Sequence, residues 1–543
     1  MTHGAFQTPT PVNEPVREYR PGSPERSSLE VALAECAGAS ADVPLIIDGN
    51  EVRTDATGTM VMPHDHGHVL GTYHKAGAAE VAAAIEAAET ARAGWASLPW
   101  EERAAVFLRA AELLAGPWRD RINASTMLNQ SKTVHQAEID AACELIDFFR
   151  FNVHFLRQLY QSQPESSPGC WNRIEHRCLD GFVFAITPFN FTSIAGNLPT
   201  APAMLGNTVL WKPASTSVLS NYLLMEMLAE AGLPPGVINF VPGSGAEVGD
   251  PVIADARLAG VHFTGSTEVF QGIWGRVGAN IRSYGQYPRL VGETGGKDFI
   301  FAHPSADVAA LATAVIRGAF EFQGQKCSAA SRAYVPASLW GELAERLGTE
   351  LAGVRMGDVR DFGNFMGAVI DASSFAKLGA AVDLARNDDG CEIVAGGERD
   401  DSTGWFVQPT VVRVDDPRHE LMRTEYFGPL IAVHVYDDER VDDALELCAT
   451  GSEYGLTGAV FADDRAAVAH ASERLRFAAG NFYVNDKPTG AVVGQQPFGG
   501  SRASGTNDKA GSILNLLRWS SQRTIKETFV PPRDWRYPFL EGN

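Results

Sequence analysis

Apolar segments of strand length alternate with helical segments after residue 180, and this alternation restricts the fold more than any other feature. Strands are predicted at residues 181–186, 208–211, 237–241 and 260–263, with helices near 218–231 and 246–254 between some of them. Strands joined through helices favour a parallel sheet, because each crossover has to return the chain to the same end of the sheet. The sequence therefore predicts an α/β fold, and its 543 residues are enough for two or three domains.

Further helices are predicted near residues 78–94, 101–115 and 136–160. The last keeps apolar residues at helical spacing on two adjoining rows, so we expect it to be mostly buried. Glu144 lies within it. A buried carboxylate needs a partner, so Glu144 is either a substrate-site residue or, if its face is exposed, an ordinary surface residue.

The composition excludes several classes of protein. A formal net charge of −21 disfavours nucleic acid as a partner, because the surface repels a polyanion. No apolar run reaches the roughly 18 residues that a membrane span needs. The seven cysteines lack the paired spacing of a disulfide framework, Cys170 and Cys178 excepted. Free thiols, and an N-terminal stretch without a hydrophobic signal core, predict a cytoplasmic location.

Cys327 is the clearest candidate for a reactive residue. It lies among small residues in the segment EFQGQKCSAASR (321–332), with Lys326 beside it and Arg332 five positions on. Cationic neighbours favour the thiolate, which is the nucleophile. An inert structural cysteine remains the alternative, although such a residue more often sits in an apolar run, as Cys448 does.

Glu293 is the second candidate. It ends an apolar segment and is followed by Gly295 and Gly296, which permit a tight turn and a close backbone approach. A carboxylate there can act as a general base if the site raises its pKa. Taken alone, it could equally be a solvated turn residue.

The segments around Cys327 and Glu293 together resemble the cysteine and glutamate signatures of the aldehyde dehydrogenase superfamily. The resemblance covers about residues 45 to 530 and includes five further segments, namely TPFNF (187–191), LWKPAS (210–215), FTGSTE (263–268), EYFGP (425–429) and PFGGS (497–501). It implies the aldehyde dehydrogenase fold, with an atypical Rossmann NAD-binding domain, an α/β catalytic domain and a β-flap for oligomerisation. The turn at Gly265 lacks the G-x-G-x-x-G of the ordinary dinucleotide fingerprint.

The resemblance also implies a role for individual residues. Cys327 is the expected nucleophile, Glu293 the general base and Asn190 the donor to the oxyanion. The residues expected to bind the NAD cofactor are Thr187, Lys212, Ser215, Gly265, Ser266, Thr267, Glu425 and Phe427.

Four segments resemble the 1-pyrroline-5-carboxylate dehydrogenase subfamily in particular, namely residues 136–152, 292–297, 495–500 and 502–509. This implies NAD-dependent oxidation of L-glutamate γ-semialdehyde to L-glutamate in proline degradation, through a thiohemiacetal and a thioester on the cysteine. The residues expected to contact this substrate are Glu144, Phe191, Ser328, Gly490, Ala491 and Phe498.

Two positions depart from related sequences. Some relatives carry serine where this chain has Ala491, which removes one side-chain donor. Many NAD-selective relatives carry glutamate where this chain has Ser215, and a carboxylate there would repel a 2′-phosphate. NAD remains the expected cofactor, while exclusion of NADP is left open.

The resemblance divides the chain as follows: an extended N-terminal arm (1–42), an NAD-binding domain (43–162 and 183–294, with 496–521 returning to it), a catalytic domain (295–495) and an oligomerisation flap (163–182 and 522–543). Trp535, Tyr537 and Phe539 lie in the flap's tail. Exposed strands with aromatic residues usually find a partner, so a homodimer or larger homo-oligomer is expected. A separate proline dehydrogenase is a candidate partner.

Other interpretations leave more unexplained. A cysteine acyltransferase or amidase would account for Cys327 and Glu293 but not for Lys212 and Glu425, and a non-catalytic relative would be expected to lose the nucleophile. His64, His66 and His68 alternate and would share one face of a strand, but no further ligand cluster accompanies them, so no metal is expected.

Overall fold

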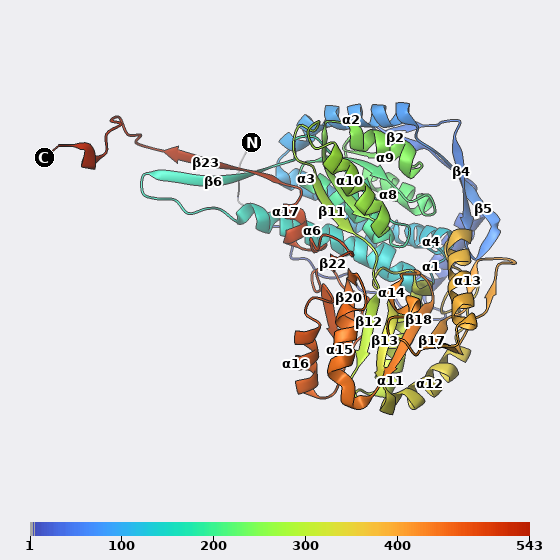
Figure 1. The fold of residues 1–543 in the computed structure, drawn as a ribbon. Helices are drawn as coiled ribbons and strands as arrows, with labels where there is room; N and C mark the ends of the chain where they lie inside the picture. Colours follow the sequence, from blue (N-terminus) through green and yellow to red (C-terminus); the bar gives the residue numbers. More distant parts are fainter. Residues whose placement is uncertain (1–3, 5, 543) are drawn as a thin grey trace.

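The computed structural model describes residues 4 and 6–542 and contains two seven-stranded sheets, which occupy the upper and lower lobes in Figure 1. A paired ribbon of two strands projects from the upper lobe, beside the C-terminal end of the chain (Figure 1). The α/β class predicted from the sequence is confirmed.

The first sheet has the order β11-β10-β7-β8-β9-β2-β3. The four predicted strands are β7 (Phe182–Ile186), β8 (Thr208–Lys212), β9 (Ile238–Phe240) and β10 (Leu258–Thr264). They run parallel with β11 (Arg289–Glu293), whereas β2 (Leu45–Ile47) and β3 (Asn50–Val52) are antiparallel additions at one edge. Strands β7 to β10 are almost wholly buried, as parallel strands covered on both faces are.

The second sheet has the order β14-β17-β18-β13-β12-β20-β21. Its strands are β12 (Asp298–Ala302), β13 (Ala330–Pro336), β14 (Cys391–Ala395), β17 (Thr410–Val414), β18 (Leu430–Tyr436), β20 (Thr457–Phe461) and β21 (Asn481–Val484). All pairs are parallel except β14 with β17. The helices that accompany it are α11 (Val308–Phe320), α12 (Ala337–Ala352), α13 (Ala372–Asn387), α15 (Val441–Thr450) and α16 (Arg465–Arg474).

Four helices of the upper lobe lie where helices were predicted, namely α2 (Ala78–Ser97), α3 (Trp100–Ala115), α8 (Val218–Glu230) and α9 (Gly245–Ala254). Three others, α4 (Arg119–Gln130), α7 (Thr192–Met204) and α10 (Thr267–Ala279), were not predicted. The long helix predicted near 136–160 is three pieces in one: α5 (Val134–Ala137), a π-helical segment η1 (Glu138–Glu144) and α6 (Leu145–Gln161). A π segment within a helix often marks a functional site, and this one ends at Glu144.

The remaining elements are short. They are the sheet of β1 (Ala41–Val43), β5 (Asp65–His74) and β4 (Thr57–Met62), the pairs β15 (Arg399–Asp400) with β16 (Phe406–Val407) and β19 (Tyr454–Gly455) with β22 (Ser501–Arg502), the helices α14 (Glu420–Arg423) and α17 (Ile513–Leu517), and the 3-10 turns η2 (Glu321–Gly324), η3 (Asp438–Arg440) and η4 (Pro538–Leu540).

The N-terminal arm differs in part from the extended arm that we predicted. Residues 24–38 form helix α1 (Pro24–Gly38), which begins at a Ser23 cap whose side chain accepts a hydrogen bond from the Arg26 amide. Leu29 and Leu33, four residues apart, bury the same face of this helix. A Ser-Pro start followed by that spacing is a helix signal, which the polar composition of the arm obscured.

A buried ion pair fastens the arm to the helices beneath it. Arg119, whose side chain is 1% exposed, contacts the fully buried carboxylate of Glu138 and donates to Glu14 Oε1 at 2.6 Å. Tyr19 Oη donates to Glu138 Oε2 at 2.8 Å. The arm is therefore part of the buried structure at these points.

The projecting ribbon consists of β6 (Cys170–Arg177) and β23 (Ser521–Thr528), paired antiparallel over their whole length. Its strands have mostly exposed or half-buried residues. Trp535, Tyr537 and Phe539, which follow β23, are all more than 60% exposed. Among residues 4 and 6–542, no helix is both long and apolar enough to cross a membrane. All seven cysteines are free thiols.

We predict that Arg119→Met lowers the free energy of unfolding by about 3–5 kcal/mol, because Glu138 would remain buried without its counter-ion. Urea unfolding followed by circular dichroism measures the change. Arg53→Met, which breaks exposed pairs with Asp42 and Glu51, is the matched control and should shift the midpoint much less. Equal shifts in the two variants would contradict a structural role for the buried pair.

Candidate active site

Cys327 follows a sharply turned loop that other segments hold in place. Phe322 and Gln323 both have left-handed backbones, with φ of 52° and 55°, which non-glycine residues rarely adopt without support. The support comes from Gln323, whose Nε2 donates to the carbonyls of Ser131 (2.9 Å) and Ala368 (2.7 Å). The loop that carries the thiol is therefore rigidly positioned.

The charges around the thiol differ from those that we predicted. Burial raises the pKa of the Cys327 thiol well above its usual value, and the nearby carboxylates of Asp298, Glu293 and Glu425 raise it further. The prediction that Lys326 and Arg332 favour the thiolate is wrong for this structure. Lys326 Nζ binds Glu321 Oε2 at 3.1 Å, and Arg332 Nε donates to the Lys297 carbonyl at 2.8 Å. Lys326 and Arg332 are close to Cys327 in the sequence, but in the structure their side chains bind other groups.

Asn190 reaches the same loop from the first sheet. It lies between β7 and α7, and its side chain is 3% exposed. Its Nδ2 donates to the carbonyl of Gln325 at 3.0 Å, two residues before Cys327. The structure thus brings the predicted oxyanion donor to the nucleophile loop.

Glu293 ends β11, the edge strand of the first sheet. Its Oε2 accepts a hydrogen bond from the Gly500 amide at 3.3 Å, in the late glycine turn that the sequence singled out. Burial raises the pKa of Glu293 well above its ordinary value, and the Gly500 amide lowers it only in part. A buried carboxyl of raised pKa has the property required of a general base.

Ser328 joins the nucleophile loop to the predicted turn at Gly490 and Ala491. Its Oγ lies 2.7 Å from Thr489 Oγ1, in a hydrogen bond in which either hydroxyl can donate. Gly490 has φ of 94°, a conformation that favours glycine. Thr489 was not predicted as a site residue, although its position directly before Gly490 could have indicated it.

The other predicted substrate residues surround this region. Glu144 Oε2 accepts a hydrogen bond from Ser193 Oγ at 2.9 Å, and burial raises the pKa of Glu144 to about 8. Glu144 is therefore half-buried and has a hydrogen-bond partner. Phe191 directly precedes α7, and Phe498 is held by two backbone hydrogen bonds with Ala510, at 3.0 and 2.8 Å.

A buried Lys132–Asp140 pair supports these residues and was missed in the sequence. Lys132 Nζ lies 2.6 Å from Asp140 Oδ2 and 4.2 Å from the centre of the Phe191 ring. Asp140 also accepts the backbone amides of Thr192 (3.0 Å) and Ser193 (2.9 Å), at the start of α7. Single charged residues eight positions apart carry no recognisable pattern, so no sequence signal could have found the pair.

The predicted cofactor residues Thr187 and Lys212 lie at the ends of adjacent parallel strands. The Thr187 amide donates to the Lys212 carbonyl at 3.1 Å, and Trp211 Nε1 donates to Thr187 Oγ1 at 3.0 Å. Burial lowers the pKa of Lys212 to about 8, and its Nζ contacts only the Pro213 carbonyl, at 3.3 Å, among the described residues. Ser215 is exposed nearby in the sequence. Ligands of open α/β sheets bind at this end of the strands.

The turn from β10 into α10 contains Gly265, Ser266 and Thr267. Ser266 caps the helix by accepting the Val269 amide at 3.4 Å, and the Gly265 amide donates to the Glu293 carbonyl at 3.3 Å. Thr267 Oγ1 accepts the Gly295 amide at 3.3 Å. Free amides at a helix N-terminus favour an anion such as a pyrophosphate.

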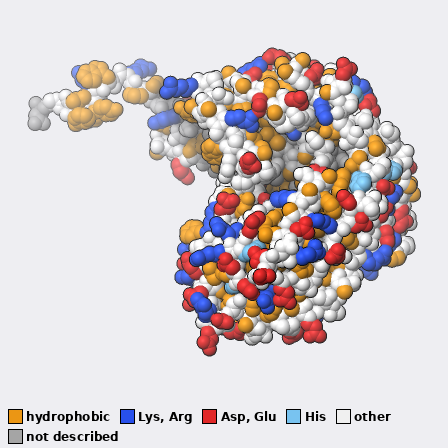
Figure 2. All heavy atoms as spheres, turned by 45° about the vertical axis from the view of Figure 1, so that its right-hand side comes forward, with side chains coloured by type: hydrophobic (Ala, Val, Ile, Leu, Met, Phe, Trp, Pro, Cys, Tyr) orange, Lys and Arg blue, Asp and Glu red, His pale blue; other side chains and the backbone are white. Residues whose placement is uncertain are grey.

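Glu425 comes from the other lobe to the same place. Its Oε1 accepts the Gly296 amide at 2.8 Å, and a Cβ at Gly295 would lie 2.3 Å from its Oε2. Phe427 meets Phe189 edge to face at 5.8 Å. A cavity of about 500 Å³ adjoins Glu425 and is lined by Arg418, Glu420, Arg423, Thr424, Glu453 and Tyr454. Figure 2 shows the surface hollowed between the two lobes.

The histidines that alternate in sequence do not converge. Their partners are Ser131 for His64, the Asp401 carbonyl for His66 and the Ala37 carbonyl for His68. Each histidine therefore has its own structural contact.

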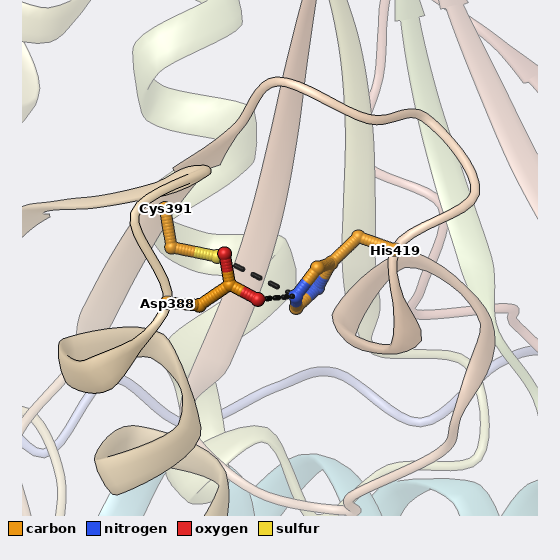
Figure 3. A group of neighbouring side chains, drawn as sticks. All are labelled: Asp388, Cys391 and His419. Carbon is orange, nitrogen blue, oxygen red and sulfur yellow. Dashed lines mark hydrogen bonds and ion pairs between the residues drawn. The ribbon is translucent and has the colours of Figure 1, made fainter.

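Another group, Asp388, Cys391 and His419, does bring three potential metal ligands together (Figure 3). His419 Nδ1 accepts the Leu421 amide at 3.1 Å, so in the neutral ring the proton is on Nε2, which points to Asp388 Oδ2 at 3.3 Å. The nitrogen that faces the group is thus a donor, which suits a hydrogen bond and not a metal.

Comparison with known proteins identifies close relatives. Delta-1-pyrroline-5-carboxylate dehydrogenase, mitochondrial, from Dictyostelium discoideum is 51% identical, over 99% of this chain and 98% of the relative. The protein of the same name from Bos taurus is 50% identical, over 97% and 94%. The predicted resemblance to this subfamily is confirmed.

The same names contradict the predicted location. Both relatives are named mitochondrial proteins, so the prediction of a cytoplasmic location is wrong on this comparison. Cysteine spacing and the composition of the first residues, on which the prediction rested, do not distinguish one reducing compartment from another.

Solved structures agree with the fold. Delta-pyrroline-5-carboxylate dehydrogenase from Mycobacterium tuberculosis bound with NAD is 58% identical with a TM-score of 0.96, over 99% of this chain and 100% of that one. Proline utilization A from Bdellovibrio bacteriovorus is 30% identical with a TM-score of 0.90, over 96% of this chain and 54% of that one.

The sequence profile described as "Aldehyde dehydrogenase family" matches residues 52–525. This match spans most of the chain and includes every segment on which the resemblance was based. The chain belongs to the aldehyde dehydrogenase family.

Proposed function

We propose that the chain oxidises L-glutamate γ-semialdehyde, derived from 1-pyrroline-5-carboxylate, to L-glutamate with NAD, as the second step of proline degradation. The observation that carries the proposal is the meeting of three segments at the thiol: the Cys327 loop, the Asn190 amide bonded to Gln325, and the Glu293 carboxylate at the end of β11. The names of the close relatives support the same substrate.

The first half of the reaction forms a bond from sulfur to carbon. The sulfur of Cys327 attacks the aldehyde carbon, and the carbonyl electrons move to oxygen. Because burial raises the pKa of the thiol, its proton has to leave before the attack, and water in the site would accept it, so that Glu293 stays ionised for the second half. The oxyanion of the thiohemiacetal accepts hydrogen bonds from the Asn190 amide and the Cys327 backbone amide, and one such donor is worth about 3–4 kcal/mol.

The second half releases the product. Bound NAD would supply the acceptor for the hydride that leaves the former aldehyde carbon. Cys327 is then left as a thioester. Glu293 takes a proton from water, the water oxygen attacks the thioester carbon, and the C–S bond breaks to give the carboxylate and the free cysteine.

The proposed cofactor contacts fit a dinucleotide. Lys212 and Ser215 would hold the adenosine ribose, with Thr187 beside them, and the turn at Gly265, Ser266 and Thr267 would hold the pyrophosphate. Glu425 and Phe427 would hold the nicotinamide ribose. The support is physical: Lys212 offers ammonium protons without a carboxylate partner among the described residues, and a helix begins at Thr267.

The proposed substrate contacts distinguish glutamate semialdehyde from simple aldehydes. Ser328 and the backbone amides of Gly490 and Ala491 would bind the α-carboxylate, while Phe191 and Phe498 flank the aliphatic carbons. Glu144 would complete the pocket at its buried end. The Ser328–Thr489 hydrogen bond supports this arrangement, because it brings the hydroxyl to the turn.

We also propose the division into an NAD-binding domain (43–162 and 183–294, with 496–521) and a catalytic domain (295–495). The β6–β23 ribbon would pair with a second copy of the chain, since its strand edges and the aromatic residues after β23 are exposed. A separate proline dehydrogenase would supply the substrate, an idea supported by the likeness to proline utilization A.

Replacement of the nucleophile should separate binding from chemistry. Cys327→Ser should retain NAD binding, measured by fluorescence quenching, and lose NADH formation at 340 nm, because a serine hydroxyl is far harder to ionise. Cys391→Ser, which changes a half-buried cysteine on β14, the edge strand of the second sheet, is the control and should keep its activity. Turnover of Cys327→Ser within about tenfold of the unmodified enzyme would exclude the role.

Replacement of the base should separate the two halves of the reaction. Glu293→Gln should give a burst of NADH and then stall, with an acyl adduct on Cys327 detected by intact-protein mass spectrometry. In the unmodified enzyme, thioester hydrolysis needs the ionised carboxylate, so its rate should fall as the pH drops through a midpoint well above 4.5. Steady turnover of the variant without an adduct would assign the base elsewhere.

A third substitution tests the substrate. Ser328→Ala removes one hydrogen bond to a charged group, worth roughly 1.5–3 kcal/mol, so kcat/KM for glutamate semialdehyde should fall by about one to two orders of magnitude. Propanal, which has no carboxylate, is the control substrate and should be affected much less. Thr489→Val, which removes the hydroxyl that orients Ser328, should shift the same ratio in the same direction. Equal losses on both aldehydes would mean that Ser328 supports Cys327 itself.

A further inference from the structure

The N-terminal arm passes beside the loop that carries the proposed carboxylate-binding turn. Asn13, in the extended part of the arm, uses its whole side-chain amide there. Its Nδ2 donates to the Val493 carbonyl and to Asp147 Oδ2, both at 2.8 Å, and its Oδ1 accepts from Gln495 Nε2 at 2.9 Å. One residue of the arm thus connects helix α6 with the loop.

We propose that Asn13 is a positioning residue for substrate selection, which fixes the loop at 490–496 so that the amides of Gly490 and Ala491 point at the α-carboxylate of the substrate. The inference rests on the proposed function, because it assumes that this turn binds that carboxylate. Asn13 itself does not contact the turn and takes no part in the chemistry.

The loop packs against the body through the buried side chain of Val493, but few hydrogen bonds fix its backbone. Residues 490–496 form no helix or strand, and Gly490 and Gly494 both have left-handed backbones, with φ of 94° and 81°. The internal hydrogen bonds run from the amides of Gln495 and Gln496 to the Val492 carbonyl, both at 3.0 Å, and from the Val492 amide to Gln496 Oε1 at 2.9 Å. Among the described residues, Asn13 is the only residue outside 490–496 that hydrogen-bonds to this segment.

The arm is held firmly enough to support the loop. The Glu14 amide donates to Asp147 Oδ1 at 2.7 Å, next to the bond from Asn13. The Glu14 carboxylate binds Arg119 at 2.6 Å and Arg150 at 2.8 Å, both of which belong to helices. Helices of the upper lobe therefore fix the position of Asn13. Asn13 in turn fixes the loop through its hydrogen bonds with Val493 and Gln495.

This arrangement has a selective consequence. If the loop shifts, the backbone amides of the turn no longer point at the substrate carboxylate. Cys327, Asn190 and Glu293 keep their own contacts, which lie in other segments. Only substrates with a carboxylate at that position should be penalised. The effect should appear in KM, because the contact is made equally in the ground state and the transition state.

The test is steady-state kinetics on the full-length protein with NAD. Asn13→Ala should raise KM for glutamate semialdehyde about threefold to tenfold, the range expected for loss of ordinary hydrogen bonds, with kcat nearly unchanged. The kcat/KM for propanal should stay within about twofold. Val12→Ala, on the neighbouring residue whose side chain is 70% exposed, is the matched control and should change neither.

Gln495→Ala removes the same contact from the side of the loop. It provides a second test if Asn13→Ala does not fold. It should raise the same KM to a smaller extent. In the double variant, KM should rise by less than the product of the two single increases, because the two residues act through one contact. An unchanged KM in both single variants, or an equal loss on propanal, would overturn the inference while leaving the proposed function intact. If the unmodified enzyme failed to oxidise glutamate semialdehyde with NAD, the proposed function and this inference would fall together.

Discussion

The passage of the chain from the first sheet to the second is the constraint on which the site depends. β11 ends at Glu293 and β12 begins at Asp298, so the four residues 294–297 carry the chain from the first sheet to the second. At Gly296 a Cβ would lie 2.1 Å from the Cys327 carbonyl, and at Gly295 it would meet the Glu425 carboxylate. The absence of side chains at these two positions lets the nucleophile loop and the proposed ribose-binding carboxylate approach the same stretch of backbone. The proposed general base, Glu293, is the last residue of β11 and is positioned by that strand.

Burial, more than charge pairing, sets the electrostatics around that passage. The pKa of Asp298 is raised well above its usual value by desolvation, and its Oδ2 has no hydrogen-bond partner among the described residues. Burial also lowers the pKa of Lys297 to about 7. Desolvation therefore favours the uncharged form of both side chains, although one is an acid and the other a base.

The sequence predicted what depends on local pattern. The alternation after residue 180 gave β7 to β10 in their order, and the short motifs identified Cys327, Asn190 and Glu293, which the fold brings to one loop. Contacts between distant segments escaped prediction. Lys326 and Arg332 are neighbours of the cysteine in sequence, yet their partners, Glu321 and the Lys297 carbonyl, are decided by the turn at Phe322 and by β-strand pairing. The Lys132–Asp140 pair and the contacts of Asn13 likewise exist only after tertiary folding.

The projecting ribbon also has a consequence for the order in which the chain folds. Its strands are far apart in sequence, since Arg177 and Ser521, which face each other, are separated by 344 residues. Closing a loop of that length in an unfolded chain would cost about 5 kcal/mol of entropy. A ribbon with so few buried residues cannot recover this, so its strands have to pair after the body between them has folded and brought their ends together. Nascent or partly folded molecules would then lack the paired edge, and contact between copies through that edge would be reserved for chains whose folding is complete.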